Sequence, residues 1–453
     1  MARAMTEERK YWNAEIEGMD PGELRRLESR KLADLAAYVE ANSPFYRHKF
    51  GRVGVKAGDI RSLDDLERLP FTTKDELRET QEKDGGLGGH LCAPRNKVVR
   101  VQGTSGSTGR PLYVGLTAHD TEVWADLFAR HAWIGGLRPG DSMINPANFT
   151  LFVGGLSEAV SAERMGITVT PVPLVSAGIA KLLQVITDLE PNILFATPSA
   201  TWLLEDVIRS QLGCEPHELS FRKGFLAGEP LVDKDRAHIE ETWGIDARNF
   251  YGLADVAADL ASECEAKDGM HFVGQGCVVA ELIDPDTGES REMTDGATGE
   301  IIYTTIDREA TPVIRYRTRD VVRVRTEPCR CGRSSFRLHI IGRSDDMLKV
   351  KGVNVFPSAV KDVVSSFIPR TTGEMRIVLE QPGHIVGTNL RLKVEYGYDI
   401  KGEDRIAALR DELEQAIKQQ LAFRPVIEMI PPGTLPRSTY KVEYFEHRFT
   451  QGR

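Results

Sequence analysis

A glycine- and hydroxyl-rich segment at residues 104–111 constrains this chain more than any other stretch. It follows an apolar, β-branched run at 98–101 that predicts a strand. Glycines allow a tight turn close to a ligand, and successive N–H groups and hydroxyls can then surround an anion. An arginine near the end of the segment carries a permanent charge that suits phosphate oxygens. The segment consists of Thr104, Ser105, Gly106, Ser107, Thr108, Gly109, Arg110 and Pro111.

Two interpretations of this segment stay open when it is taken alone. A Ser/Gly-rich stretch is equally typical of a flexible linker. The segment also lacks the Gly-Lys-Ser/Thr ending of a Walker loop. Phosphate binding is therefore a hypothesis that depends on the rest of the chain.

The residues that follow predict an α/β fold. Between about 119 and 260, helical patterns such as 179–189 and 233–243 alternate with short apolar runs such as 192–197 and 224–228. This alternation predicts a largely parallel sheet covered by helices, with ligands at the carboxyl ends of the strands. Near the N-terminus, leucines at helical spacing predict a helix over 20–42. Short strands are expected at 299–306, 313–316, 321–325 and 337–341.

Length and composition narrow the class of protein. A chain of 453 residues with 41% hydrophobic content is long enough for two to four globular domains. The net charge of −9 argues against nucleic acid or an anionic membrane as the main partner. No apolar run approaches the roughly 20 residues that span a bilayer, and the polar first ten residues predict no signal peptide. Six cysteines are too few for a disulfide scaffold, so we expect a cytoplasmic protein.

Further motifs lie downstream of the glycine-rich segment, and two of them follow predicted strands. These two are Ala227-Gly228-Glu229-Pro230 and Tyr251-Gly252-Leu253-Ala254-Asp255. A third, Arg315-Tyr316-Arg317-Thr318-Arg319-Asp320, ends in a carboxylate, an acceptor-only group suited to a vicinal diol. The last two motifs are Gly342-Arg343-Ser344-Asp345-Asp346 and Leu435-Pro436-Arg437-Ser438-Thr439-Tyr440-Lys441.

Taken together, these motifs resemble the adenylate-forming superfamily, and the phenylacetate–CoA ligase branch in particular. In that superfamily the glycine-rich loop reads Ser/Thr-Ser/Thr-Gly-Ser/Thr-Thr-Gly-x-Pro, and the branch commonly carries Arg-Tyr-Arg-Thr-Arg-Asp. The resemblance spans nearly the whole chain. The chain departs from the superfamily pattern at Ala254 in place of a hydroxyl residue, at Asp255 in place of Glu, and at Tyr440 in place of Gly.

The resemblance implies a role for each motif residue. Tyr251 would stack on adenine, Asp320 would accept both ribose hydroxyls, and Arg343 would help to fix the nucleoside. Asp255 keeps the hard oxygen that Mg²⁺ prefers. Lys441 would be the catalytic lysine, which neutralises charge on the α-phosphate and the carboxylate. The residues implied to hold the rest of ATP are Thr104, Ser105, Gly106, Ser107, Thr108, Gly109, Arg110, Gly228, Glu229, Pro230 and Gly252.

The resemblance also implies two domains joined by a hinge. The predicted fold class is α/β, with a large N-terminal adenylate-forming domain of mixed sheets and flanking helices over 1–345. Its first 80 residues are expected to be helical. A small mobile α+β domain would follow over 346–453, with strands at 375–380 and 389–396 and a helix over 404–421. Asp345 would be the pivot about which this domain exchanges the lysine loop for a CoA-binding face.

The acid pocket is expected around an aromatic and amide-rich stretch at 145–155. In the phenylacetate–CoA ligase branch the matching segment helps to line the acyl pocket. Phe149 and Phe152 are also compatible with a simple packing role, and we assign only Phe149 to the pocket. The residues predicted to line it are Asn148, Phe149, Gly154, Ala227 and Ala254.

Three cysteines and one histidine form a candidate metal set. Cys264, His271, Cys329 and Cys331 offer three thiolates and one imidazole, the chemistry of a structural Zn²⁺ site. The Cys-x-Cys spacing is tighter than the usual Cys-x2-Cys, and the two pairs lie far apart in sequence. Unrelated reduced thiols on loops are the alternative.

The function implied by the resemblance is ATP-dependent acid–CoA ligation through an acyl-AMP intermediate. The acid would be aromatic, such as phenylacetate or a benzoate-like acid, and AMP and pyrophosphate would be released. The partners are then a small carboxylic acid, ATP, Mg²⁺ and CoA, and a homodimer is one assembly to expect. Two alternatives stay open, an adenylating enzyme that loads a carrier-protein thiol and a non-catalytic nucleotide-binding homologue.

Overall fold

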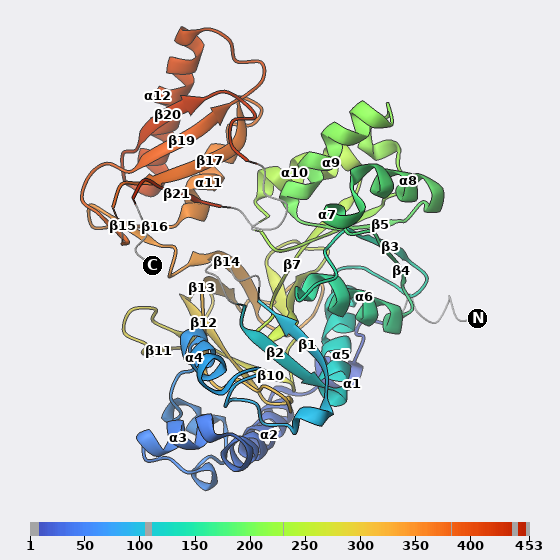
Figure 1. The fold of residues 1–453 in the computed structure, drawn as a ribbon, viewed down its shortest axis with the longest axis vertical. Helices are drawn as coiled ribbons and strands as arrows, with labels where there is room; N and C mark the ends of the chain where they lie inside the picture. The colour runs from blue at the N-terminus through green and yellow to red at the C-terminus, as the bar shows by residue number, and fades with distance from the viewer. Residues whose placement is uncertain (1–8, 105–110, 230, 382, 437–442, 450–453) are drawn as a thin grey trace.

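The computed structural model describes residues 9–104, 111–229, 231–381, 383–436 and 443–449. A large body of sheets and helices makes up most of the molecule, and a smaller domain built from the last hundred residues sits at its upper left in Figure 1. Within the described ranges, none of the helices is both long and apolar enough to cross a bilayer.

The N-terminal region is helical and lies at the base of the large body (Figure 1). Its longest helix, α2 (Pro21–Asn42), begins where the sequence predicted, because the Asp20 carboxylate accepts hydrogen bonds from the N–H groups of Gly22 and Glu23. One face of α2 is buried through Leu32, Leu35 and Val39. The other elements are α1 (Ala14–Glu17), α3 (Pro44–Arg52), η1 (Ala57–Asp59), η2 (Leu63–Arg68), α4 (Lys74–Asp84) and η3 (Arg95–Lys97).

A twelve-stranded sheet runs through the large body, and its first half is parallel, as the helix–strand alternation predicted. The parallel strands are short and bring their carboxyl ends to one edge. They are β3 (Ser142–Asn145), β4 (Thr168–Pro171), β5 (Ile193–Ala196), β6 (Lys223–Leu226) and β7 (Asp246–Leu253).

Helices cover both faces of the parallel half because neighbouring strand residues point to opposite sides. Met143 and Ile193 pack against α5 and α6, whereas Ile144 and Leu194 pack against α8, α9 and α10. The helices are α5 (Ala118–Ile134), α6 (Val153–Met165), α7 (Leu174–Ala177), α8 (Ile179–Leu189), α9 (Pro198–Gln211), η4 (Pro216–Glu218) and α10 (Asp233–Trp243).

The second half of the sheet is antiparallel from β7 onward. Its strands are β8 (Ala257–Glu263), β9 (Met270–Phe272), β10 (Val278–Ile283), β11 (Ser290–Arg291), β12 (Thr298–Thr305), β13 (Tyr316–Arg325) and β14 (Arg337–Arg343). The full strand order is β11-β10-β12-β13-β14-β9-β8-β7-β6-β5-β3-β4. A separate antiparallel pair, β1 (Val98–Gly103) and β2 (Tyr113–Thr117), flanks the glycine-rich segment.

One predicted strand is wrong. Residues 313–315 lie outside any strand, and strand β13 begins only at Tyr316. Arg315 has a φ of +46°, which a β-strand does not adopt. Its guanidinium instead donates to the carbonyls of Glu67 and Leu69 and pairs with Glu281, so the chain turns here to tie the N-terminal region to the sheet.

The C-terminal domain has its own hydrophobic core, separate from those of the large body. Helix α12 (Glu403–Leu421) buries Leu409, Leu413 and Ile417 on one face, as the sequence predicted. The remaining elements are β15 (Leu348–Val350), β16 (Val353–Val355), α11 (Pro357–Ser365), β17 (Thr371–Leu379), β18 (Ile385–Val386), β19 (Arg391–Tyr396), β20 (Val426–Ile430) and β21 (Phe445–His447). A large α/β body with a small α+β domain confirms the predicted fold class.

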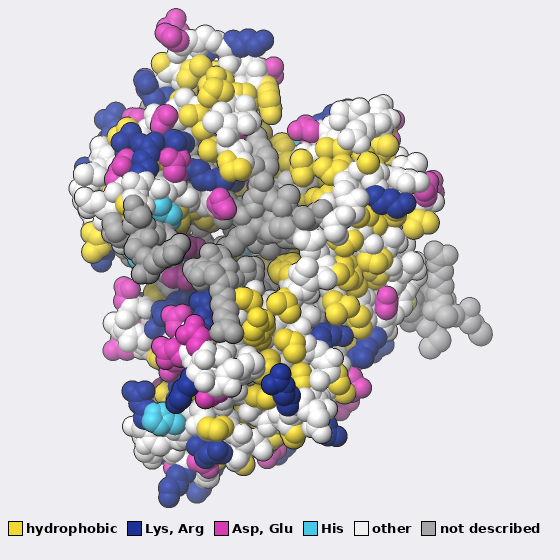
Figure 2. Space-filling view, viewed as in Figure 1, with side chains coloured by type: hydrophobic (Ala, Val, Ile, Leu, Met, Phe, Trp, Pro, Cys, Tyr) yellow, Lys and Arg dark blue, Asp and Glu magenta, His cyan; other side chains and the backbone are white. Residues whose placement is uncertain are grey.

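Acidic and basic side chains lie intermixed over the face of the molecule in Figure 2. Neither the C-terminal domain nor the large body presents a broad basic surface on this face, which agrees with the net charge of −9.

Gly252 generates a prediction about the backbone of β7. The pairing of β7 with β8 shifts register between Tyr251 and Leu253, and a Cβ at Gly252 would lie 1.7 Å from the carbonyl oxygen of Ala258. We expect Gly252→Ala to lower the free energy of unfolding by at least about 1–3 kcal/mol, because backbone must move to admit the methyl group. Thermal denaturation measures this loss.

The matched control is Gly58→Ala, because a Cβ at Gly58 meets nothing within 4 Å. We expect this control to change stability by less than about 0.5 kcal/mol. Equal melting temperatures for the two variants would contradict the prediction.

Candidate functional site

A cavity of about 1440 Å³ lies between the large body and the C-terminal domain. The large body contributes the ends of β5, β6 and β7 and the start of α6. The C-terminal domain contributes Pro357, Ser358, Asp362 and Tyr444. The cavity therefore lies at the carboxyl edge of the parallel strands, where open α/β sheets bind ligands.

Three of the predicted nucleoside residues meet at one wall of this cavity. The Tyr251 hydroxyl donates to Asp320 Oδ2 over 2.6 Å, and Arg343 Nη1 donates to Asp320 Oδ1 over 3.0 Å. The pairing of β13 with β14 places Asp320 directly opposite Arg343. Burial raises the pKa of Asp320, and the positive charge of Arg343 opposes that rise. The cluster presents an aromatic ring, a carboxylate and a guanidinium together.

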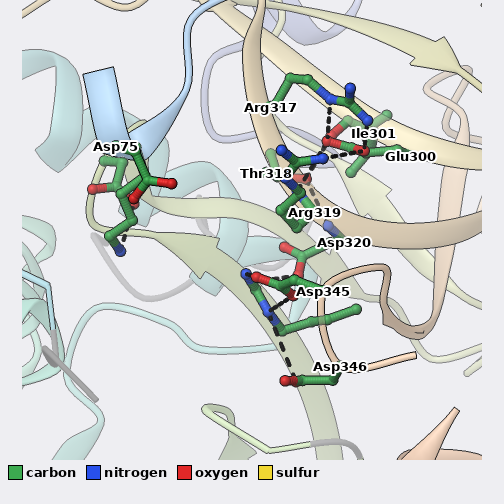
Figure 3. A network of polar contacts seen from close by, with 12 residues as sticks. Asp75, Glu300, Ile301, Arg317, Thr318, Arg319, Asp320, Asp345 and Asp346 are labelled. Atoms are coloured by element: carbon green, nitrogen blue, oxygen red, sulfur yellow. Dashed lines mark hydrogen bonds and ion pairs between the residues drawn. The ribbon is translucent and has the colours of Figure 1, made fainter. Parts of the chain in front are cut away.

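Arg343 also connects this cluster to the predicted hinge. Its Nε and Nη2 atoms donate to the two carboxylate oxygens of Asp345 over 2.9 and 2.8 Å. Asp320, Asp345 and Asp346 lie close together in Figure 3. The nucleoside cluster and the start of the C-terminal domain are thus linked through one arginine.

Strand β13 is held in place by a buried carboxylate that the sequence analysis did not identify. Glu300 on β12 is fully buried, pairs with Arg317 over 2.5 Å and accepts from the backbone N–H of Arg319 over 3.1 Å. The Thr318 hydroxyl donates to the carbonyl of Ile301 over 2.6 Å (Figure 3). These contacts fix the backbone on which Asp320 sits. In the pairing of β12 with β13, Arg317 lies opposite Ile302, two positions from Glu300. The sequence alone does not reveal this ion pair, because it depends on which strands are paired.

Asp255 is suited to a divalent cation. Its side chain is only 7% exposed and lines the cavity, and Oδ2 lies 3.5 Å from Lys74 Nζ. Across the described residues, Oδ1 of Asp255 has no hydrogen-bond partner. A buried carboxylate oxygen left free at the wall of a cavity fits Mg²⁺, which takes one or two carboxylates and completes its shell with water and phosphate oxygens.

The turn after β6 brings two further predicted residues to the cavity. Gly228 and Glu229 line it, and Gly228 has a φ of +82°, which glycine adopts without strain. Glu229 accepts from the backbone N–H of Ser199 over 3.0 Å and from its hydroxyl over 2.7 Å. Glu229 therefore ties this turn to the first residues of α9.

Four of the five residues predicted for the acid pocket line the cavity. Asn148, Gly154, Ala227 and Ala254 all line the cavity. Phe149 does not, whereas Phe152 does. The structure thus places Phe152 at the cavity wall, and the role of Phe149 in the acid pocket stays a prediction.

Several predicted ATP residues lie outside the described part of the chain. They are Ser105, Gly106, Ser107, Thr108, Gly109, Arg110, Pro230 and the catalytic candidate Lys441. Thr104 and Gly252 are described, and both line the cavity. The Thr104 hydroxyl accepts from the N–H of Leu112 over 3.2 Å and so closes the base of the glycine-rich segment.

The cysteine–histidine set converges on one point, and its four residues are not among those that line the cavity. Its four donor atoms all lie within 4.8 Å of one another. Cys264 Sγ lies 3.6 Å from Cys329 Sγ, and Cys331 Sγ lies 3.3 Å from His271 Nε2. Two sulfurs on one tetrahedral Zn²⁺ are about 3.8 Å apart at Zn–S bonds of about 2.3 Å. The pairing of β8, β9 and β14 brings together residues that the sequence separates by up to 67 positions.

A buried glutamate that the sequence analysis missed also lines the cavity. Glu158 is 2% exposed, and its Oε2 has no hydrogen-bond partner in the described ranges. Burial raises the pKa of Glu158 well above its ordinary value, and the charge of Asp259 raises it further. The available signal was spacing, because Glu158 follows the predicted pocket residue Gly154 by four positions on a helix.

The sequence matches the profiles of two known protein families. The sequence profile of the AMP-binding enzymes matches residues 53–306, and that of the AMP-binding enzyme C-terminal domain matches residues 352–448. The chain belongs to the AMP-binding enzyme family. The resemblance to the phenylacetate–CoA ligase branch is confirmed by full-length relatives within this family.

Among these relatives are phenylacetate–coenzyme A ligases of three bacteria. The Thermus thermophilus protein is 34% identical and the match covers 94% of this chain and 97% of the relative. The Pseudomonas putida protein is 35% identical with 95% and 97% coverage. The Escherichia coli protein is 33% identical with 94% and 95% coverage.

A solved AMP-binding enzyme matches the structure in one of its states better than in others. The 2-hydroxyisobutyryl-CoA ligase in its postadenylation state, in complex with R3-HIB-AMP, has a TM-score of 0.88 at 27% identity, with 97% of this chain and 93% of that chain covered. The TM-score is 0.71 for the same ligase in the thioesterification state and 0.73 for its open conformation.

The raised pKa of Glu158 generates a prediction about pH and stability. Above pH 4.5 the unfolded glutamate loses its proton while the folded one keeps it, so the folded state binds more protons and stability falls as pH rises. Each pH unit in this window costs about 1.4 kcal/mol until the folded pKa is reached. We expect Glu158→Gln to be more stable than the unaltered protein at pH 7, with a difference that shrinks to zero below pH 4.5.

Chemical denaturation between pH 4 and pH 8 measures this difference. The matched control is Glu163→Gln on the same helix, because Glu163 is exposed and should leave the pH profile unchanged. A Glu158→Gln profile that runs parallel to that of the unaltered protein would contradict the prediction.

Proposed function

We propose that this chain is an ATP-dependent acid–CoA ligase that activates an aromatic carboxylic acid through an acyl-AMP intermediate. The observation that supports the proposal is a single cavity that is lined by a polar cluster and by aromatic rings. The Tyr251–Asp320–Arg343 cluster suits a nucleoside, and the wall with Phe195 and Phe250 suits an apolar ring. Phenylacetate–coenzyme A ligases that match over nearly their whole length support the same reaction.

In the first half-reaction, a carboxylate oxygen of the acid attacks the α-phosphorus of ATP. The bond to the bridging β-phosphate oxygen breaks, so acyl-AMP forms and pyrophosphate leaves with the bonding electron pair. The protein supplies alignment and charge neutralisation for such a step. Asp320 would hold the ribose hydroxyls, Tyr251 would stack on adenine, and Lys441 would stabilise charge on the α-phosphate. The glycine-rich segment 104–110 would hold the departing pyrophosphate.

Asp255 is the residue that would hold Mg²⁺ with the substrate phosphates. The cation would supply positive charge to the phosphate oxygens when bound. Ala254 offers no hydroxyl at the adjacent position, so the phosphate contact expected there from the superfamily pattern would have to come from elsewhere.

In the second half-reaction, the CoA thiol attacks the acyl carbonyl carbon. The bond from that carbon to the AMP oxygen breaks, the thiol proton is lost to solvent, and the thioester and AMP are released. We infer a division into domains at 1–345 and 346–453, with Asp345 as the pivot between the two steps. The large sheet ends with β14 at Arg343 and the small sheet begins with β15 at Leu348, which leaves four residues between them.

The higher TM-score to the postadenylation state supports a rotation of this kind. The same relative in its thioesterification state differs more from this chain, although the sequence identity is nearly equal, at 27% and 28%. The Arg343–Asp345 pair would hold the C-terminal domain in the adenylation arrangement, and rotation would break it.

A test of the proposal separates the two half-reactions. We expect Lys441→Ala to slow acyl-AMP formation by about 100- to 1,000-fold, the loss typical of a removed transition-state charge. Acid-dependent ATP–pyrophosphate exchange measures this step. Thioester formation from supplied acyl-AMP and CoA should largely survive, because adenylation is already complete.

Lys401→Ala is the control, because Lys401 is an exposed lysine of the same domain. Equal losses in both half-reactions of Lys441→Ala would remove its assignment to adenylation. Failure of the unaltered protein to release AMP with any aromatic acid and CoA would overturn the proposed function.

We also propose that Cys264, His271, Cys329 and Cys331 hold one structural Zn²⁺. The donor distances fit a tetrahedral ion, and the carbonyl of Ser335 lies 3.3 Å from His271 Nδ1, where it can fix the ring so that Nε2 faces the thiols. The ion would tie β8, β9 and the β13–β14 turn together.

Metal analysis tests the zinc proposal. We expect about one Zn²⁺ per chain, and Cys331→Ser should lower both the zinc content and the melting temperature because one of four ligands is lost. Cys214→Ser is the control, since that thiol lies outside the cluster. A metal-free preparation with an unchanged melting temperature would rule out a structural zinc.

Two further expectations stay predictions. A homodimer would be tested by sedimentation, and a cytoplasmic location would be tested by fractionation of cells that express the protein.

A further inference from the structure

The strongest unexplained feature of the described residues is the free carboxyl of Glu158 at the wall of the acid pocket. A buried polar atom without a partner costs about 1–3 kcal/mol, and native proteins leave few of them. Oε2 of Glu158 is such an atom in the part of the chain that the structure describes. Neither the ATP site nor the catalytic lysine assigned above uses Glu158.

The position of Glu158 relative to the pocket follows from helix α6. Gly154 and Glu158 are four residues apart on this helix, so both side-chain positions lie on one face. Both residues line the cavity. Gly154 carries no side chain, and the ring of Phe152 lies beside it, with Cε1 2.6 Å from where a Cβ would stand.

Glu158 has a second buried acidic group near it, on a neighbouring strand. Its like-charged neighbour Asp259 lies on β8 and has Oδ1 2.9 Å from His131 Nδ1. The His131 ring packs against Phe250, with ring centroids 4.6 Å apart, and Phe250 packs against Phe195 at 5.6 Å. Both phenylalanines line the cavity. Glu158 therefore lines the same cavity as these two aromatic rings.

The protonation of Glu158 determines which ligand group it suits. Burial and the nearby Asp259 both favour the neutral carboxyl, which raises its pKa. A neutral carboxyl offers one O–H donor and one acceptor oxygen. A hydroxyl or an amino group of a ligand satisfies both functions, whereas a methyl group satisfies neither.

We propose that Glu158 is a specificity-determining residue, and that the acid substrate carries a hydroxyl or amino substituent that hydrogen-bonds to Glu158. This inference rests on the proposed ligase function and adds the class of acid to it. An unsubstituted aromatic acid would leave Glu158 unpaired under a bound ring. Sites built to hydrogen-bond a substrate discriminate strongly against analogues that lack the group.

The test uses pairs of aromatic acids that differ only by hydroxyl or methyl at one ring position. The panel consists of phenylacetates and benzoates with the substituent at each ring position, and the readouts are acid-dependent ATP–pyrophosphate exchange and CoA thioester formation. For at least one position, we expect kcat/KM of the unaltered protein to be 10-fold or more higher for the hydroxylated acid than for its methyl partner.

Two variants connect this preference to the carboxyl. Glu158→Leu should remove or reverse the preference, because it replaces the polar group by an apolar one of similar size. Glu158→Gln keeps a donor and an acceptor and should retain most of the preference. Glu163→Leu, on the exposed side of the same helix, should change neither rate.

The outcomes separate this inference from the proposed function. Activation of methylated acids as fast as hydroxylated ones at every position would overturn the inference and leave the ligase function intact. A hydroxyl preference that persists in Glu158→Leu would also overturn it. Absence of AMP release with every acid would overturn the ligase function and the inference together. If Glu158→Leu fails to fold, the unaltered protein and Glu158→Gln still decide the result.

Discussion

The ion pair between Asp320 and Arg343 is the interaction on which the candidate site depends. It joins two paired strands at a distance of 3.0 Å, and each partner makes a second contact. Asp320 accepts from Tyr251 at the end of the parallel half of the sheet, and Arg343 pairs with Asp345, the proposed pivot just before the C-terminal domain. A half-buried pair of this kind is favourable because further hydrogen bonds satisfy both groups. It thereby connects the nucleoside wall with the proposed pivot.

The site is built from polar groups placed in the low-dielectric interior of the large body. The desolvation cost of each group is offset in a different way. Glu300 pairs with Arg317 and accepts a hydrogen bond from the backbone N–H of Arg319 on β13. Asp320 is balanced by Arg343. Oδ1 of Asp255 and Oε2 of Glu158 have no hydrogen-bond partner among the described residues, and both line the cavity. Buried groups that the protein leaves unpaired at a cavity wall are the groups that a ligand can satisfy, because their desolvation has already occurred on folding.

Much of the fold follows from local patterns. Asp20 and Pro21 start α2 because a capping carboxylate and a fixed φ act within one turn of chain. Leu409, Leu413 and Ile417 face the core of the C-terminal domain because helical spacing puts them on one side. The strand predicted at 313–316 was wrong because Arg315 pairs with Glu281 and donates to backbone carbonyls of the N-terminal region. Glu281 lies more than 30 residues away in the sequence, and the carbonyls lie more than 200 residues away. Long-range contacts of this kind leave no periodic trace in the sequence.

The sequence by itself determined the family, the order of its motifs and the chemical type of each site residue, because these depend on residue identity and local spacing. Only the tertiary structure decided that Phe152 lines the cavity, that the four zinc candidates converge, and that Oε2 of Glu158 has no hydrogen-bond partner within the described ranges. The physical reason is that the burial of a side chain and its hydrogen-bond partners depend on the three-dimensional packing of the chain. Tertiary packing brings together residues that lie far apart in the sequence, such as Arg315 and Glu67, and the cost of an unpaired carboxyl arises only where that packing excludes water.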